Sequence, residues 1–427
     1  MTQPTLGPFA VTGPREVADP YPLYRRYREL DPVHRVPPSA PGAPVTWHLF
    51  RYADVAAVLS SQHFGRSAAV ARQGLDPVPP LIPDGRPALR DVVDNWLVFL
   101  DPPRHTRLRA VVTRYFTARI VAGLRPRIAA LAGELLTAVG GRSEVDLVAD
   151  FAAPLPILVI SELLGVPPGR RDWFREHAVA LQQANTSRRG DRHARYAAAE
   201  AAAAALAGYF QAEVAKRRRT GCDDVIGRLA SDEGLTDREI VGTCIHLLTA
   251  GHETTTNLLA KAVLALSSRP DVLHDLRTMP QLLPTAVDEL VRYDSPVQMV
   301  TRWAYRDETV GGRLVERGSR VVLMLGSANR DPEQYAEPDT LDIRRSVGRH
   351  LGFGMGIHYC LGAGLARAEA EIGLAALVRR LPHLALCPEP VPYADDMVFH
   401  GPSRLMVRTD APPDAAAGHA AAVRRAG

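Results

Sequence analysis

One cysteine stands among closely spaced glycines near the C-terminus. The run 353–362 contains Gly354, Gly356 and Cys360, and an Ala/Glu/Arg-rich helical pattern follows from about Gly364. Glycine allows positive φ angles and lets the backbone approach a large flat group closely. A cysteine just before a helix N-terminus is expected to have a lowered pKa, because the helix dipole and free N–H groups stabilise the thiolate. The pattern therefore predicts a thiolate ligand for a metal centre.

A second group of polar residues interrupts a long apolar pattern. Thr236 and Glu239 match a capping box, and apolar or small residues then recur at helical spacing as far as Leu266. This predicts a helix of roughly 30 residues, about 45 Å long, that crosses the interior. Glu253 and Thr254 stand in its middle, where an acid and a hydroxyl are poor core material. They form either a solvent-exposed polar patch or one wall of a reaction pocket.

Both groups resemble motifs of one family. The Phe, Gly, Gly, His, Cys and Gly positions between 353 and 362 are similar to the haem-binding signature of the cytochrome P-450 family, the haem-thiolate monooxygenases. The stretch 250–255 resembles that family's oxygen-binding groove. The resemblance implies that Cys360 ligates the iron of haem b (iron protoporphyrin IX), which favours O–O cleavage. It also implies that Glu253 relays protons, that Thr254 holds a water beside bound dioxygen, and that the haem-binding loop residues include Phe353, Gly354 and Gly362.

An acid and a base follow at i and i+3. Glu289 and Arg292 alone predict an ordinary helical ion pair. They also resemble the family's Glu-x-x-Arg pair, which implies a buried network with an arginine from a later loop that keeps the Cys loop in place. Arg345 is the best match for that third residue, with Arg344 as the neighbouring candidate. Leu341 stands where the family usually has Phe.

A haem needs cations for its two propionates. The resemblance implies that these are His105, Arg109, Arg302 and His350, and Arg is well suited to binding carboxylates. Taken singly, each residue could equally be a solvated surface charge. A zinc site is the other reading of the closely spaced His350, His358 and Cys360, but no second Cys/His pair accompanies them.

The substrate pocket can be proposed only from the resemblance. The stretch 62–95, expected to be a long loop, and the connection near 180–195 would cover it. Its lining is expected to be largely apolar, although ordinary core packing explains the same residues equally well. The candidate lining residues are Leu247, Ala250, Thr254, Val297, Val300, Val398 and Phe399.

The fold expected from these patterns is mainly α with a minor β portion. One cytochrome P-450 domain would span residues 1–409, with the long central helix over the haem opposite the Cys loop, and residues 410–427 would form a disordered tail. Helices or strands are further predicted at 21–30 (helix), 45–50 (strand), 52–60 (helix), 197–219 (helix) and 300–325 (short strands).

Composition bounds the setting in which the protein works. The chain has 427 residues, 46% of them hydrophobic, and a net charge of only +4, which does not favour a nucleic-acid partner. No signal peptide and no apolar run of about 18 residues is seen, so we expect no membrane span. Four cysteines without a pairing pattern favour a reducing cytoplasm. The resemblance implies a monomer.

The expected function is that of a bacterial haem-thiolate monooxygenase. It would use dioxygen and two electrons to hydroxylate a small apolar molecule, most simply in specialised (secondary) metabolite biosynthesis. No reductase domain is fused to the chain, so electrons would come from NAD(P)H through a ferredoxin reductase and a ferredoxin. The ferredoxin could dock on a basic face that includes Arg104, Arg107, Arg114, Arg344, Arg345, Arg349 and Arg367.

Other outcomes stay open. The same haem centre could support epoxidation, dealkylation or oxidative C–C or aryl coupling. A peroxide-driven enzyme and a haem-thiolate sensor are further alternatives, as is a helical scaffold without haem. The peroxide-driven type usually lacks the acid–Thr pair, which this chain keeps as Glu253 and Thr254.

Overall fold

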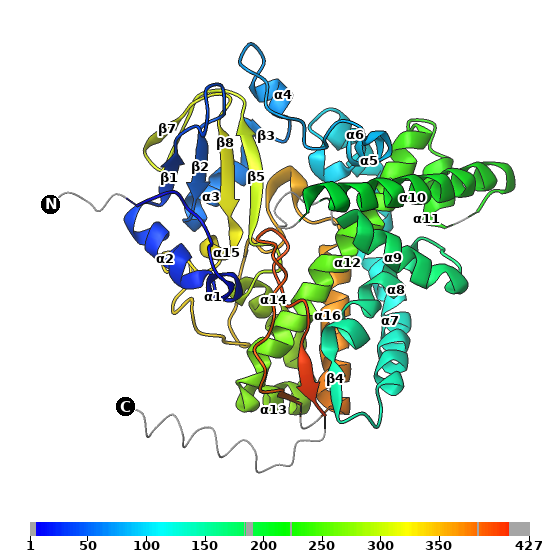
Figure 1. The fold of residues 1–427 in the computed structure, drawn as a ribbon. Helices are drawn as coiled ribbons and strands as arrows, with labels where there is room; N and C mark the ends of the chain where they lie inside the picture. Colours follow the sequence, from blue (N-terminus) through cyan, green and yellow to red (C-terminus); the bar gives the residue numbers. More distant parts are fainter. Residues whose placement is uncertain (1–5, 183, 185–190, 223, 382–383, 410–427) are drawn as a thin grey trace, which may run out of the picture.

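The computed structural model describes residues 6–182, 184, 191–222, 224–381 and 384–409. The expected tail at 410–427 lies outside these residues. So does 185–190, the middle of the expected connection near 180–195. Within them helices dominate and a small sheet stands to one side, shown at the left of Figure 1. The mainly α architecture with a minor β portion is therefore confirmed.

The helices follow one another along almost the whole described chain. They are α1 (Pro14–Ala18), α2 (Tyr21–Leu30), α3 (Tyr52–Ser60), α4 (Ala68–Ala71), α5 (Pro87–Val93), α6 (Arg104–Val112), α7 (Ala118–Ala138), α8 (Pro154–Leu163), α9 (Arg171–Gln182), α10 (Arg192–Thr220), α11 (Val225–Ala230), α12 (Asp237–Ser267), α13 (Pro270–Thr278), α14 (Leu283–Tyr293), α15 (Leu325–Ala328) and α16 (Ala363–Arg380). A short 3-10 helix, η6 (Gly356–His358), precedes Cys360.

The strands form small sheets. The largest has the order β1-β2-β8-β5-β3, in which β2 and β8 are parallel and the other pairs are antiparallel. Its strands are β1 (Val33–Val36), β2 (Thr46–Leu49), β3 (Phe64–Gly65), β5 (Met299–Ala304) and β8 (Arg320–Met324). The smaller sheets comprise β4 (Glu144–Asp146) with β10 (Met406–Arg408) and β9 (Ala385–Leu386), and β6 (Glu308–Val310) with β7 (Arg313–Val315).

The predicted central helix is present as α12, 31 residues long. The Thr236 hydroxyl accepts a hydrogen bond from the Glu239 N–H, and the Glu239 carboxylate accepts one from the Thr236 N–H, so the capping box is confirmed. α12 runs through the middle of the molecule (Figure 1) and packs against α5, α8, α10, α14 and α16. No described helix is both long and apolar enough to cross a bilayer.

The stretch 62–95 is not the uninterrupted loop that its prolines suggested. It contains β3, α4 and α5. α5 forms because Pro87 starts it and because Leu89, Val92 and Val93 lie on one face that is buried against α10 and α12. That burial is a tertiary effect that the loop composition concealed.

Candidate active site

The Cys360 loop is a tight turn that requires its glycines. Gly354 and Gly356 both have φ of 71°, in the left-handed region. The Cys360 N–H donates to the Phe353 carbonyl at 2.8 Å, which closes the loop just before α16 begins. A Cβ on Gly356 would lie 2.2 Å from the carbonyl oxygen of Leu59, so the loop rests directly on the end of α3.

Replacing Gly356 with alanine should therefore destabilise the protein. A left-handed backbone alone costs a residue other than glycine about 1–2 kcal/mol, and the clash with Leu59 adds to it. We expect urea denaturation to show a loss of about 2–4 kcal/mol in the free energy of unfolding. Gly123→Ala in α7 is the control, because no atom lies within 4 Å of its new Cβ. Equal stability of the two variants would contradict the close packing of this loop.

The Cys360 thiol lies between basic groups. Burial raises its pKa, and the N–H of Gly362 with the guanidinium groups of Arg109 and Arg367 offsets this only in part. The predicted lowering of the Cys360 pKa is thus wrong for the protein alone, because the sulfur loses more solvation than the helix N-terminus returns. A thiolate here needs a metal cation to hold its charge, and this suits a ligand of haem iron.

α12 has one open face in an otherwise buried stretch. Between positions 239 and 263, all of them described, the residues that are not buried are His246, Ala250, Gly251, Glu253 and Thr254. They lie on one side of the helix because they recur at three- and four-residue spacing. No atom lies within 4 Å of where a Gly251 Cβ would stand. The open face can therefore accept a flat cofactor or a substrate.

The threonines of this region hydrogen-bond to their own helix. Thr254 Oγ1 donates to the Ala250 carbonyl at 3.0 Å, which is the expected bond to the preceding turn. Thr249 and Thr256 make the same kind of bond, to Ile245 at 3.0 Å and to His252 at 2.9 Å. Such back-bonds loosen the regular ladder and bend helices. The Thr254 hydroxyl is thereby oriented while its side chain stays partly exposed.

Basic side chains gather beside the Cys loop. The rings of His105 on α6 and His358 in η6 lie 4.4 Å apart. Burial, together with Arg302, His105, Arg66 and Arg109, lowers the pKa of His358 to about 2. Among the described residues, neither nitrogen of His105 nor Nε2 of His358 has a hydrogen-bond partner. Buried donors that repel one another fit an anion such as a haem propionate.

Burial also lowers the pKa of two arginines beside these histidines. Burial and the nearby Arg66 lower the pKa of Arg302 to about 9, and burial lowers the pKa of Arg66 to about 10. The structure thus brings His105, Arg109 and Arg302 together. It adds His358, which already stood in the Cys motif, and Arg66, for which the sequence offered no signal. These five residues form the cationic cluster.

His350 lies apart from this cluster. Its Nε2 is 3.4 Å from Asp288 on α14, and its Nδ1 accepts from the Gly352 N–H. Arg367 binds the same Asp288 carboxylate at 2.7 Å, and its guanidinium lies over the Phe353 ring. His350 is therefore placed to anchor the start of the Cys loop to α14. No three His, Cys, Asp or Glu side chains in the described ranges form a metal-binding group.

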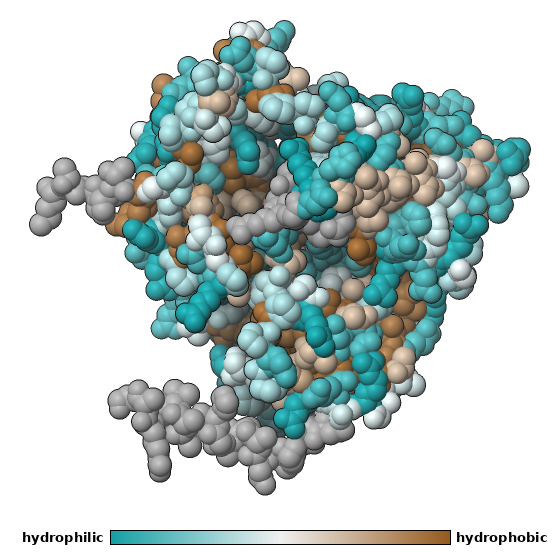
Figure 2. Space-filling model, viewed as in Figure 1, coloured by the Kyte–Doolittle hydropathy of each residue, from teal (hydrophilic) through white to brown (hydrophobic). Residues whose placement is uncertain are grey.

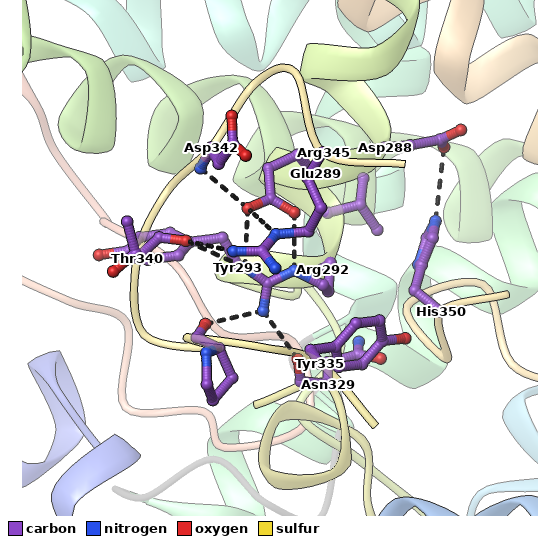
Figure 3. A network of polar contacts seen from close by, with 12 residues as sticks. Asp288, Glu289, Arg292, Tyr293, Asn329, Tyr335, Thr340, Asp342, Arg345 and His350 are labelled. Atoms are coloured by element: carbon purple, nitrogen blue, oxygen red, sulfur yellow. Dashed lines mark hydrogen bonds and ion pairs between the residues drawn. The ribbon is translucent and has the colours of Figure 1, made fainter. Parts of the chain in front are cut away.

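Glu289 and Arg292 form a fully buried bidentate pair, shown in Figure 3. The guanidinium nitrogens of Arg292 lie 2.7 and 2.8 Å from the Glu289 carboxylate, and both side chains are 0% exposed. Arg345 joins at 3.2 Å, whereas Arg344 pairs with Asp275 instead. Arg345, the better of the two sequence matches, is thus the third member of the network.

This network reaches the Cys loop through one asparagine. Arg292 donates to the Asn329 carbonyl at 2.9 Å, and the Asn329 side-chain oxygen accepts from the Leu351 N–H at 2.7 Å. Arg292 also donates to Pro338 at 2.8 Å, and Arg345 to Ala336 at 2.6 Å. The pair therefore ties α14 to the stretch 329–351, which leads to Cys360.

The candidate pocket residues fall into two groups. Val297 pairs with Phe399 in an isolated β-bridge, and the Val398 carbonyl accepts from the Gln298 N–H at 3.0 Å. Val300 follows on β5 and is partly exposed. On α12, Ala250 belongs to the open face, but Leu247 is buried in the main core. Figure 2 shows a hollow between β5 and α10 with hydrophobic side chains inside it.

Comparison with known proteins decides the family. The cytochrome P-450 family model matches residues 194–396. Cytochrome P-450 107B1 from Saccharopolyspora erythraea is 38% identical over 400 residues, 91% of this chain and 94% of that protein. Mycinamicin IV hydroxylase/epoxidase from Micromonospora griseorubida is 36% identical over 394 residues, 90% of this chain and 94% of that protein. The chain belongs to the cytochrome P-450 family.

A solved structure confirms the P-450 fold. The crystal structure of P-450 BioI in complex with hexadec-9Z-enoic acid ligated acyl carrier protein superposes with a TM-score of 0.84 at 33% identity. The match covers 93% of this chain and 99% of that chain. As a member of this family, the P-450 is an oxygen-incorporating oxidoreductase with a haem-thiolate centre that uses dioxygen.

Part of the basic face suggested for ferredoxin is already engaged in this P-450. Arg104 and Arg107 both bind the Glu239 carboxylate at the start of α12. Their neighbour on α6, His105, belongs to the cationic cluster. A charge reversal at these arginines would break the α12 cap as well as any docking contact, so they are poor probes of a partner.

Proposed function

We propose that this P-450 hydroxylates an apolar specialised metabolite, with electrons from NAD(P)H supplied through a ferredoxin reductase and a ferredoxin. The observation that carries the proposal is the open face of α12. An acid and an oriented hydroxyl, Glu253 and Thr254, stand on this face in the middle of a largely buried helix. A scaffold or a simple haem sensor has no need of that pair.

Haem bound at this site would supply the activation of dioxygen at its iron. The residues that would hold it are Cys360, whose thiolate would bind the iron, and, for the propionates, the cationic cluster of Arg66, His105, Arg109, Arg302 and His358. Thr254 Oγ1, whose own proton is bonded to the Ala250 carbonyl, would accept a hydrogen bond from a water and hold that water in place. Glu253 would return protons to that position from solvent, as a carboxyl group of partial exposure can.

The substrate is proposed to be largely apolar with few polar groups. The hydrophobic hollow of Figure 2 and the Val297–Phe399 bridge support this. His246 adds one polar contact on the open face of α12, stacked on Trp96 at 5.3 Å, and burial lowers its pKa to about 4 so that it is neutral. The hydroxylase/epoxidase named among the relatives makes epoxidation the second candidate outcome.

Electron delivery is proposed to occur at the Cys loop. Ile357 and Tyr359 are exposed on this loop, and the exposed Arg349 directly precedes it in the sequence as a basic flank. An apolar patch edged by cations suits an acidic iron–sulfur protein. The solved relative is in complex with a fatty acid ligated to an acyl carrier protein. Free and carrier-bound compounds are therefore both included in the test that follows.

The test is incorporation of isotopic oxygen. Candidate substrates, free and carrier-bound, are first screened for a shift of the ferric haem to high spin. Those that bind are incubated with ferredoxin, reductase, NADPH and labelled dioxygen. One labelled oxygen atom per product molecule supports the monooxygenase. Faster turnover with hydrogen peroxide than with the ferredoxin system would favour the peroxide-driven alternative, and no turnover of any bound compound would favour the sensor.

Thr254→Ala should uncouple oxygen use from product formation. Loss of a positioned proton source, here the water that Thr254 would hold, costs about 10²–10⁴-fold in rate. The product per NADPH consumed should therefore fall at least about tenfold, with hydrogen peroxide released instead. Thr254→Ser keeps the hydroxyl that bonds to Ala250 and should retain most of the yield. Equal yields from the alanine and serine variants would show that the hydroxyl has no part in proton delivery.

A further inference from the structure

A buried lysine stands on α12 two turns beyond Thr254. Its side chain is 1% exposed, and its Nζ lies 2.7 Å from Asp294 Oδ1, 3.0 Å from the Ser295 carbonyl and 2.7 Å from His400 Nδ1. An ammonium has three protons to donate. Lys261 thus donates each of them to one acceptor and joins α12 to two other parts of the chain.

These contacts fix the tautomer of His400. Because Nδ1 accepts from the Lys261 ammonium, the ring proton is on Nε2, which donates to the Val17 carbonyl. His400 is 0% exposed, and burial together with Lys261 lowers its pKa to about 4. The imidazole is therefore neutral at ordinary pH and remains able to accept from Lys261.

His400 ends the turn that carries two candidate pocket residues. The Asp396 carboxylate accepts from the N–H groups of Val398, at 2.8 Å, and Phe399, at 3.1 Å. The His400 N–H donates to the Pro296 carbonyl at 2.9 Å. The next residue, Gly401, lies so close to α12 that a Cβ there would be 2.4 Å from Asn257 Oδ1. The turn is thus packed against α12, and Lys261 is its charged attachment.

Other groups share the carboxylate of Asp294. Tyr21 donates to the same oxygen at 2.7 Å, and Arg330 lies over the Tyr21 ring at 4.0 Å. Asp294 itself ends α14, the helix of the Glu289–Arg292 pair. The attachment of the turn therefore draws on the same rigid region that supports the Cys loop, but its own contacts involve neither Cys360 nor the cationic cluster.

We propose that Lys261 and His400 act as a clamp that holds the Val398–Phe399 turn against α12 and so sets which substrates fit and how they lie. Both are positioning residues, and the idea rests on the proposed function because the pocket is taken to lie along α12. The clamp is about 10 Å along the helix from Thr254, at 1.5 Å per residue, which suits control of the far end of a substrate.

Two conservative variants separate the two bonds of His400. His400→Asn keeps an acceptor near the place of Nδ1, whereas His400→Gln keeps a donor near the place of Nε2. We expect His400→Gln to leave Lys261 one acceptor short and to free the turn. Amide exchange of Val398, Phe399 and His400 should rise about 10–100-fold in the protein without substrate, because a bond to a charged donor is lost. His400→Asn should stay within about threefold of wild type.

Binding and product ratios give the second readout. For His400→Gln, dissociation constants from the spin-state shift should change unequally across a substrate panel, and the ratio of oxygenated products should change, while the carbon monoxide spectrum stays that of wild type. Identical exchange in the two variants would overturn the clamp. Faster exchange with unchanged constants and product ratios would overturn its role in selectivity. If wild type forms no oxygenated product, the proposed function fails, and the exchange result stands by itself.

Discussion

Replacing Cys360 with histidine is expected to abolish the strongly red-shifted Soret band of the dithionite-reduced protein under carbon monoxide. A thiolate ligand pushes electron density onto the iron, whereas a neutral imidazole does not. Oxygenated product should fall below detection for the same reason. The measurement is the carbon monoxide difference spectrum, with circular dichroism to show that the helices persist.

The other cysteines supply matched controls. Cys222 is exposed and Cys387 is buried beside β10, and neither lies in the Cys loop. Serine at either position should leave the red-shifted band intact. A red-shifted band that survives Cys360→His, or that disappears in one of the serine variants, would place the thiolate ligand elsewhere in the chain. An unshifted band in wild type would refute the thiolate centre altogether.

Arg292→Leu is expected to have the largest effect on stability. It would leave the Glu289 carboxylate, 0% exposed, with Arg345 as its remaining cation at 3.2 Å, and it would remove the donors to Asn329 and Pro338. Removing one partner of a buried pair typically costs about 3–5 kcal/mol. Because Asn329 also binds the Cys loop at Leu351, haem content should fall together with the free energy of unfolding.

A double variant shows whether the buried charge is the cause. Glu289→Gln placed in the Arg292→Leu protein should restore part of the lost stability, since a neutral amide costs less to bury than a carboxylate. Arg306→Leu, at an exposed ion pair with Glu308, should change the denaturation midpoint little. If Arg292→Leu were as stable as Arg306→Leu, the network would not support the loop.

Features set by neighbouring residues were predictable from sequence. The Thr236–Glu239 capping box could be predicted because both partners lie within one helical turn. The bounds of α2 and α3 were also predicted correctly. The two-residue β3 and the short β4, β9 and β10 could not be predicted from sequence. Such short strands form only by pairing with partners far along the chain. α5 escaped notice because proline-rich flanks outweighed its one buried face.

The candidate site divides in the same way. The Cys motif and the Glu289–Arg292 pair are local patterns that the structure retains. The resemblance gave His105 and His350 as the histidines beside Arg109 and Arg302. The structure places His105 and His358 there, because the Cys loop folds back onto α6, whereas His350 binds Asp288. The direction of the Cys360 pKa was missed because burial depends on everything packed around the sulfur, which no spacing of residues reveals.

The order of strands in the main sheet has a consequence for how the chain matures on the ribosome. β2, near the start, has β1 on one side and β8 on the other, and β5 lies between β8 and β3. The early strands must therefore wait, with one edge unpaired, until residues 320–324 have been synthesised. The Cys360 loop emerges later still. Capture of the cofactor is thus among the last events of biosynthesis, and a ribosome that stalls before β8 releases an aggregation-prone fragment rather than a smaller working enzyme.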